Sequence, residues 1–140
     1  MDLQAITLPG NLDALEPMVA YLAEISAKAG LDKKAGYKLR LAVDEIVTNI
    51  IVHGYGDAGL TGEVEVRSWI ENQQLTIVVD DHATPYDPFT TQKPDMTSDW
   101  EQRQMGGFGV YFAQVNVDEF RYEFVDNHNR NTFVVNLPRA

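Results

Sequence analysis

The spacing of apolar residues changes once along this chain, and the change limits the folds open to it. Between residues 12 and 53 apolar side chains recur every three or four positions, as on one face of a helix. From residue 64 onward they alternate with polar side chains, which is the pattern of half-buried strands. Helices followed by strands in short hairpins predict an α+β fold with helices packed on one face of a sheet.

Caps, turns and breakers divide the chain into elements. The predicted order is a strand at residues 2–8, helices at 11–30 and 32–53, a loop at 55–62, strands near 64–69 and 75–79, a short helix at 110–115, and strands at 119–125 and 132–137. Gly54 is expected to end the second helix, and a turn is expected at residues 126–129. This order predicts one domain over residues 1–140. Its expected form is a two-layer α/β sandwich on a mixed, mostly antiparallel sheet, not a doubly wound fold.

Charge and composition restrict the partners of the chain. With 21 acidic and 11 basic side chains the formal net charge is −10, which argues against direct binding to nucleic acid or to an anionic membrane. No apolar run is long enough to span a bilayer, and Met1 to Leu3 lacks the basic start of a signal peptide, so we expect a cytoplasmic protein. The absence of cysteine excludes disulfides and thiolate metal sites.

Two polar residues of the second predicted helix have chemical potential. Glu45 and Asn49 are four residues apart, so their side chains share one face. A carboxylate beside an amide oxygen suits a general base next to a hard cation such as Mg²⁺. An amphipathic helix whose Glu and Asn are merely solvated is the alternative, and it is favoured when the segment is taken alone.

A pair of aspartates follows the predicted strand at 75–79. A carboxylate at a strand end, such as that of Asp81, is well placed to accept a hydrogen bond from the exocyclic amine of adenine. Aspartates before a proline-containing loop more often cap a turn, and this segment alone favours that interpretation. The long segment 82–105 is typical of a functional or mobile loop.

Glycines at 106, 107 and 109 precede the short helix. Backbone N–H groups in such a loop can approach phosphate oxygens at the positive end of a helix dipole, and a hinge close to the sheet is an equally good interpretation. The loop lacks the third glycine and the βαβ unit of a dinucleotide site. The histidines at 53, 82 and 128 show no zinc-ligand spacing.

The order of these segments connects them. Glu45-x-x-x-Asn49, then Asp81-x-Ala83-x-Pro85-Tyr86-Asp87-Pro88, then Gly106-Gly107-Phe108-Gly109 resemble the three sequence boxes of the GHKL (Bergerat-fold) ATPases and kinases. More narrowly, nearly the whole chain resembles the small stand-alone anti-sigma-factor serine kinases of bacteria. The resemblance implies the Bergerat ATP-binding fold, with ATP and Mg²⁺ as cofactors.

The resemblance also implies roles for single residues. Glu45 matches the general base that takes a proton from a serine hydroxyl, Asn49 matches the Mg²⁺ ligand, and Asp81 matches the residue that binds the adenine amino group. Ala83 stands where the family has glycine. Its Cβ is expected to crowd the adenine pocket without abolishing binding. The implied phosphate-contacting residues, in and beside an ATP lid at 89–105, are Gly106, Gly107, Gly109 and Arg103.

The implied function is an anti-sigma-factor serine/threonine kinase. Its partners would be a STAS-type anti-anti-sigma protein, which it phosphorylates on serine, a sigma factor and, as for many of its relatives, a second copy of itself. The alternative is a nucleotide-binding module that acts through protein–protein contacts and transfers nothing. Ala83 and the unusual lid motivate that alternative. A sensor histidine kinase fragment is disfavoured because the sequence has no phosphoacceptor helix pair.

Overall fold

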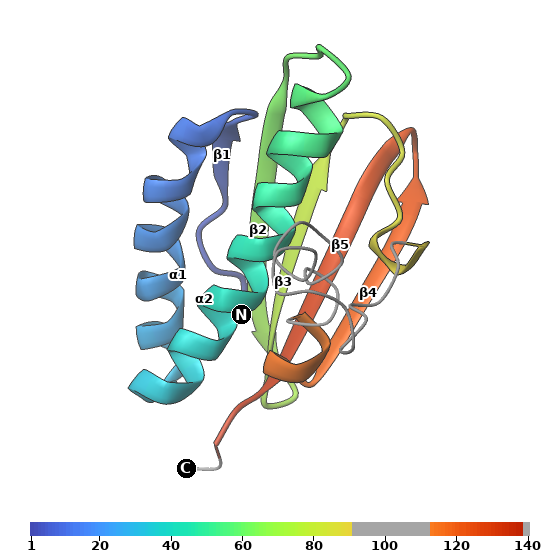
Figure 1. Ribbon diagram of the computed structural model, residues 1–140. Helices are drawn as coiled ribbons and strands as arrows, with labels where there is room; N and C mark the ends of the chain where they lie inside the picture. Colours follow the sequence, from blue (N-terminus) through green and yellow to red (C-terminus); the bar gives the residue numbers. More distant parts are fainter. Residues whose placement is uncertain (91–112, 139–140) are drawn as a thin grey trace, which may run out of the picture.

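Two helices lie on one face of a five-stranded sheet in the computed structural model, which describes residues 1–90 and 113–138 (Figure 1). The elements in chain order are β1 (Ile6–Pro9), η1 (Leu12–Ala14), α1 (Leu15–Ala29), α2 (Lys33–Asn49), η2 (Ile50–Gly56), β2 (Glu63–Glu71), β3 (Gln74–Asp81), η3 (Pro88–Thr90), β4 (Glu119–Val125) and β5 (His128–Asn136). Residues 113–116 are helical and overlap the short helix expected near 110–115, whose first part lies outside the described residues. The two-layer α+β architecture is therefore confirmed.

The sheet has the strand order β1-β2-β3-β5-β4, and every neighbouring pair is antiparallel. The expectation of a mixed sheet is wrong for the described residues. The reason is the connectivity: β2–β3 and β4–β5 are hairpins, whose strands must be antiparallel, and the two hairpins join through the antiparallel pair β3–β5.

Both hairpins turn through two residues with left-handed backbone. The φ angles lie between 50° and 65° at Asn72, Gln73, Asp126 and Asn127. Such type I′ turns match the natural twist of paired strands. The second turn is shorter than the predicted span of 126–129, so β5 begins four residues before position 132. As a result Asn129 is a strand residue.

Polar caps fix the helix boundaries largely as the sequence indicated. The side chain of Asn11 accepts a hydrogen bond at the start of η1, and Asp32 Oδ1 accepts one from the backbone of Ala35 at 2.8 Å. Gly30 ends α1 with a φ of 79°. The predicted apolar stripe of the second helix is buried, and it comprises Leu39, Val43 and Ile46 of α2 and Ile50, the first residue of η2. No helix within the described residues has the length and apolar character needed to cross a membrane.

The end of the second helix differs from the expectation. After Asn49 the chain continues through the wider π-helical turn η2 as far as Gly56, so Gly54 lies inside a helical turn and does not end it. Tyr55 explains this continuation, because its ring is 2% exposed and its hydroxyl donates to Glu63 O at 2.7 Å. The same hydroxyl accepts from the His82 N–H at 3.1 Å, which ties η2 to the end of β3.

Candidate functional site

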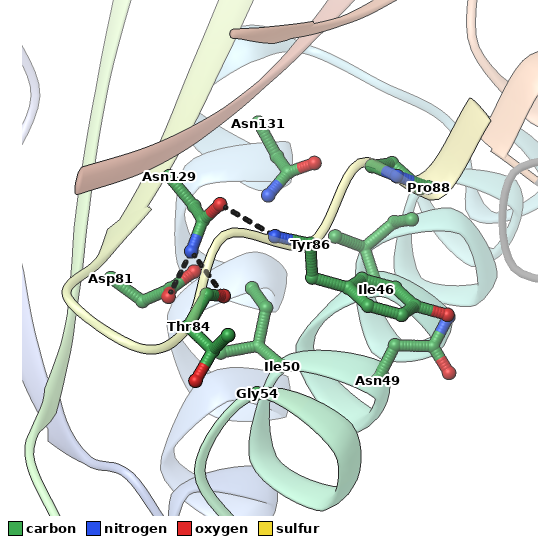
Figure 2. Close-up of a pocket in the computed structure, with 10 residues that line it drawn as sticks. All are labelled: Ile46, Asn49, Ile50, Gly54, Asp81, Thr84, Tyr86, Pro88, Asn129 and Asn131. Carbon is green, nitrogen blue, oxygen red and sulfur yellow. Dashed lines mark hydrogen bonds between the residues drawn. The ribbon is translucent and has the colours of Figure 1, made fainter. Parts of the chain in front are cut away.

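A narrow pocket lies between the C-terminal half of α2 and the inner face of β3 and β5 (Figure 2). Residues that follow β3 complete its wall. The pocket is lined by Ile46, Asn49, Ile50, Gly54, Asp81, Thr84, Tyr86, Pro88, Asn129 and Asn131. Its interior volume of about 10 Å³ has room for roughly one water molecule.

The neighbouring carboxylates Asp80 and Asp81 point to opposite faces of the sheet, since successive side chains of a strand alternate. Asp80 accepts a hydrogen bond from Arg130 Nε at 3.0 Å on the face away from the helices. Asp81 is 1% exposed and faces the pocket. Its Oδ1 accepts from the Ala83 N–H at 3.0 Å and from Asn129 Nδ2 at 2.9 Å. Its Oδ2 is buried and has no hydrogen-bond partner among the described residues.

The electrostatics of Asp81 indicate what the pocket would bind. Burial raises the pKa of the Asp81 carboxyl, and this effect is larger than the opposing effect of the hydrogen bonds from Asn129 and Ala83. A buried acceptor without a donor is costly, so the pocket favours a ligand that brings an N–H group to Oδ2. The turn-capping alternative explains the bond from Ala83 to Oδ1 but gives no role to Oδ2.

Asn129 is a site residue that the sequence analysis missed. Its side chain connects β5 to Asp81 and to the loop after β3, as the dashed lines of Figure 2 show. The prediction placed it in a turn because three of the four residues at 126–129 are Asp or Asn, which favour turns. Asparagine is also depleted in strands. The available signal was the spacing of Asn129 and Asn131, because residues two positions apart in a strand share one face and would form a polar patch there.

The polar residues of α2 occupy different places relative to the pocket. Asn49 lines it, together with Asn131, whose buried Oδ1 has no hydrogen-bond partner among the described residues. Glu45 lies one helical turn before Asn49, is partly exposed and does not line the pocket. Burial raises the pKa of the Glu45 carboxyl, and the charge of Asp44 raises it further. The structure thus places Asn49 of α2 and Asp81 of β3 in one pocket. Glu45 lies on α2 with Asn49 but outside the pocket lining.

Ala83 does not line this small pocket, and the crowding of adenine by its Cβ stays a prediction. The residue is 5% exposed and belongs to the hydrophobic core. Its methyl group instead faces Gly54, where an added Cβ would lie 3.0 Å from the Ala83 Cβ. The bare backbone of Gly54 therefore leaves room for the alanine.

Gly54→Ala is expected to lower the free energy of unfolding by about 1–3 kcal/mol, because two methyl groups would then compete for one space. Urea denaturation measures the loss. Ala83→Gly added to this variant should recover part of it. Gly36→Ala is the matched control, because a Cβ there would lie 3.7 Å from Ser26 Cβ, an ordinary contact. In α2 that change should be neutral or stabilising by about 0.5–1 kcal/mol. Equal losses at both glycines would contradict the proposed contact.

The remaining predicted site residues lie outside the described residues. They are Arg103, Gly106, Gly107 and Gly109, together with nearly all of the proposed lid at 89–105. Their roles stay predictions from the sequence. Within residues 1–90 and 113–138 no group of three or more His, Asp or Glu side chains is arranged to hold a metal ion. A Mg²⁺ ion bound by one protein oxygen and by phosphates needs no such group.

The family model described as histidine kinase-like ATPase domain matches residues 8–135, nearly the whole chain. The chain belongs to this family. Serine-protein kinases are among its relatives. The serine-protein kinase RsbW of Bacillus licheniformis is 35% identical over 107 residues, which cover 68% of the chain and 65% of the relative. RsbW of Listeria monocytogenes is 29% identical over 105 residues, 71% of the chain and 66% of the relative.

A third relative, RsbW of Bacillus pumilus, is 28% identical over 125 residues, 85% of the chain and 76% of the relative. The domain spans slightly less than two thirds of the length of the first relatives, with shares of 63% to 66%. A crystal structure of the RsbU and RsbW domains of a Mycobacterium tuberculosis protein matches with a TM-score of 0.67 at 20% identity. That match covers 99% of this histidine kinase-like ATPase domain and 34% of the other chain, and it establishes the fold.

Proposed function

We propose that the chain is a cytoplasmic serine/threonine kinase that binds Mg·ATP and phosphorylates a serine of a STAS-type anti-anti-sigma protein. It would also bind a sigma factor, and phosphorylation of the STAS partner would decide which partner it holds. The observation that carries the proposal is Asp81, a buried carboxylate whose Oδ2 lacks a donor among the described residues, in a pocket shared with Asn49. The serine-protein kinases among its relatives support the class of reaction.

The chemistry of the pocket fits the adenine end of ATP. Asp81 Oδ2 would accept a hydrogen bond from the 6-amino group, and Ile46 and Ile50 supply an apolar wall for the ring. An interior of about 10 Å³ is too small for a purine. The Tyr86 side chain, whose ring centroid lies 6.1 Å from that of His53, would therefore swing outward when the nucleotide enters.

ATP would supply the phosphoryl group, and side chains of α2 would position the reaction. Asn49 would hold Mg²⁺ through its amide oxygen. The Glu45 carboxylate would accept the proton of the serine hydroxyl as the serine oxygen bonds to the γ-phosphorus. The bond between that phosphorus and the bridging oxygen breaks in the same process, and ADP leaves. The glycines at 106, 107 and 109 and Arg103 would contact the phosphates, a part of the proposal that rests on the resemblance.

Incubation with labelled Mg·ATP and a purified STAS partner tests this function. We expect label on one serine of the partner and none when that serine is replaced by alanine. Calorimetry with ATP separates the alternative, because ATP binding without any transfer would support a nucleotide-binding module. Ala83 motivates that module, and its methyl group packs toward Gly54, a residue that lines the pocket.

Asp44 should affect how the rate of phosphate transfer varies with pH, because its charge raises the pKa of Glu45. Because the pKa of Glu45 is raised, this residue stays protonated to a higher pH than an ordinary glutamate. A general base acts only when ionised, so the rate should rise with pH through the raised pKa of Glu45. Asp44→Asn removes one cause of the shift and should move this acidic limb to lower pH. Burial is the larger cause, so the limb should stay above the usual range of glutamate.

Initial rates of transfer measured against pH show whether the limb moves. Asp13→Asn, at an exposed position in η1, is the matched control and should leave the profile unchanged. If the limb of Asp44→Asn coincides with that of the wild type, Glu45 is not the group that limits transfer at low pH.

A further inference from the structure

The side-chain amide of Asn129 joins three segments of the chain at the pocket (Figure 2). Its Nδ2 lies 2.9 Å from Asp81 Oδ1, 3.3 Å from the carbonyl oxygen of Ala83 and 3.2 Å from that of Thr84. All three neighbours are acceptors, and the residue is 2% exposed. The amide nitrogen therefore serves as a buried donor that links β5 to the end of β3.

Among the described residues, the hydrogen-bond partners of the opposite end of the amide are donors. Asn129 Oδ1 accepts from the Tyr86 N–H at 3.1 Å and from the hydroxyl of Tyr122. A 180° rotation would set the oxygen against three acceptors and the nitrogen against two N–H or O–H groups. The orientation of the amide is therefore fixed by its surroundings.

We propose that Asn129 is a positioning residue for nucleotide selectivity: it holds Asp81 Oδ1, so that Oδ2 is the acceptor presented to the ligand, and thereby favours 6-amino over 6-oxo purines. The inference rests on the proposed function, because it requires ATP in this pocket. Asn129 acts through Asp81, and the contact with the purine belongs to Asp81.

The charge of the Asp81 carboxylate determines which purine it can bind. The hydrogen bond from Asn129 lowers the pKa of Asp81 and so opposes the effect of burial. An ionised carboxylate only accepts hydrogen bonds, whereas a protonated one also donates. Without the amide, Asp81 would be protonated more often and would rotate more freely, and both changes let it bind the 6-oxygen of a purine.

Asn129→Asp tests the inference, because it replaces the donor NH₂ by oxygen at nearly constant volume. Calorimetric titration with ATP and with inosine triphosphate, which carries a 6-oxygen, gives the ratio of their dissociation constants. We expect the wild type to prefer ATP by about 10- to 100-fold, the range for a hydrogen bond to a charged group. In Asn129→Asp at about pH 8 the preference should fall to about threefold or less, because two carboxylates then repel each other.

Lower pH should restore much of the preference in this variant. At about pH 6 a proton shared between the carboxyl groups at positions 81 and 129 re-forms a donor–acceptor pair. The other titratable groups that act on Asp81 or contact its neighbours are unchanged by the substitution, and they are Tyr55, Asp80, His82 and Tyr122. Asn136→Asp makes the same change at an exposed position of β5 and should keep the wild-type ratio at both pH values.

Tyr122→Phe provides a second variant that preserves the ring and removes one of the two donors to Asn129 Oδ1. Its preference for ATP should fall several-fold. A merely structural role for Asn129 would weaken ATP and inosine triphosphate equally and leave the ratio unchanged in both variants. That result would overturn the role of Asn129 in selectivity and leave the proposed function standing. If the wild type binds neither nucleotide, the proposed function fails together with that role.

Discussion

Glu45→Gln is expected to slow phosphate transfer to the STAS serine by about 10²- to 10⁴-fold, the usual contribution of a general base. Glutamine keeps the size of the side chain and loses the carboxylate that would accept the proton. Affinity for ATP should stay close to that of the wild type, because Glu45 does not line the pocket. Label incorporation at saturating ATP gives the rate, and calorimetry gives the affinity.

Glu24→Gln is the matched control for this variant. Glu24 lies on α1, is exposed and pairs with Lys28 at 3.2 Å, so its loss should change stability by no more than about 0.5 kcal/mol and leave transfer intact. Normal transfer in Glu45→Gln would remove this residue from the mechanism. A parallel loss of ATP binding would assign it to nucleotide binding and not to proton transfer.

Asp81→Asn is expected to reverse the nucleotide preference. Asparagine can keep an oxygen toward the Ala83 N–H and Asn129 Nδ2, which donate to Oδ1 of Asp81 in the wild type. It then places an NH₂ group where Oδ2 lay. That group repels the 6-amino group of adenine and matches the 6-oxygen of inosine triphosphate. We expect affinity for ATP to fall about 100-fold and affinity for inosine triphosphate to rise, as measured by calorimetry.

Asp80→Asn makes the same chemical change one residue earlier. Because Asp80 faces the opposite side of the sheet and pairs with Arg130, this control should weaken that ion pair and leave both nucleotide affinities unchanged. Equal effects of the two substitutions would mean that general destabilisation causes the loss of ATP affinity. A selective effect at Asp81 would place the purine on the inner face.

The period of the apolar residues was enough to predict the layers of the fold. Burial of one helical stripe, from Leu39 of α2 to Ile50 of η2, and alternation along β2 both follow from packing against a single core. The π-helical turn η2 could not be predicted in this way. It depends on Tyr55, whose hydroxyl donates to the carbonyl oxygen of Glu63 and accepts from the N–H of His82. These partners lie eight and 27 residues further along the chain, beyond the helical pattern.

Only part of the site could be predicted, because local sequence patterns do not show contacts between separate segments of the chain. Asn49 and Asp81 belong to sequence boxes with recognisable spacing, and the structure brings both to one pocket. Asn129 belongs to no such box, and its local sequence favours a turn. Its role depends on the pairing of β3 with β5, which sets Asp81 opposite Asn129 in the register. Pairing between strands so far apart in sequence is invisible to local patterns.

The two-residue turn at Asp126 and Asn127 has a consequence for how this chain can vary. Hairpin tips are normally where insertions are tolerated, but side chains alternate faces along a strand. One extra residue that shifted β5 in register would turn Asn129 away from Asp81 and bring its neighbour to the inner face. Where a change of one residue in this hairpin shifts the register, Asp81 Oδ1 keeps the Ala83 N–H and loses its donor from β5, so the loop length is as much a part of the binding site as the side chains.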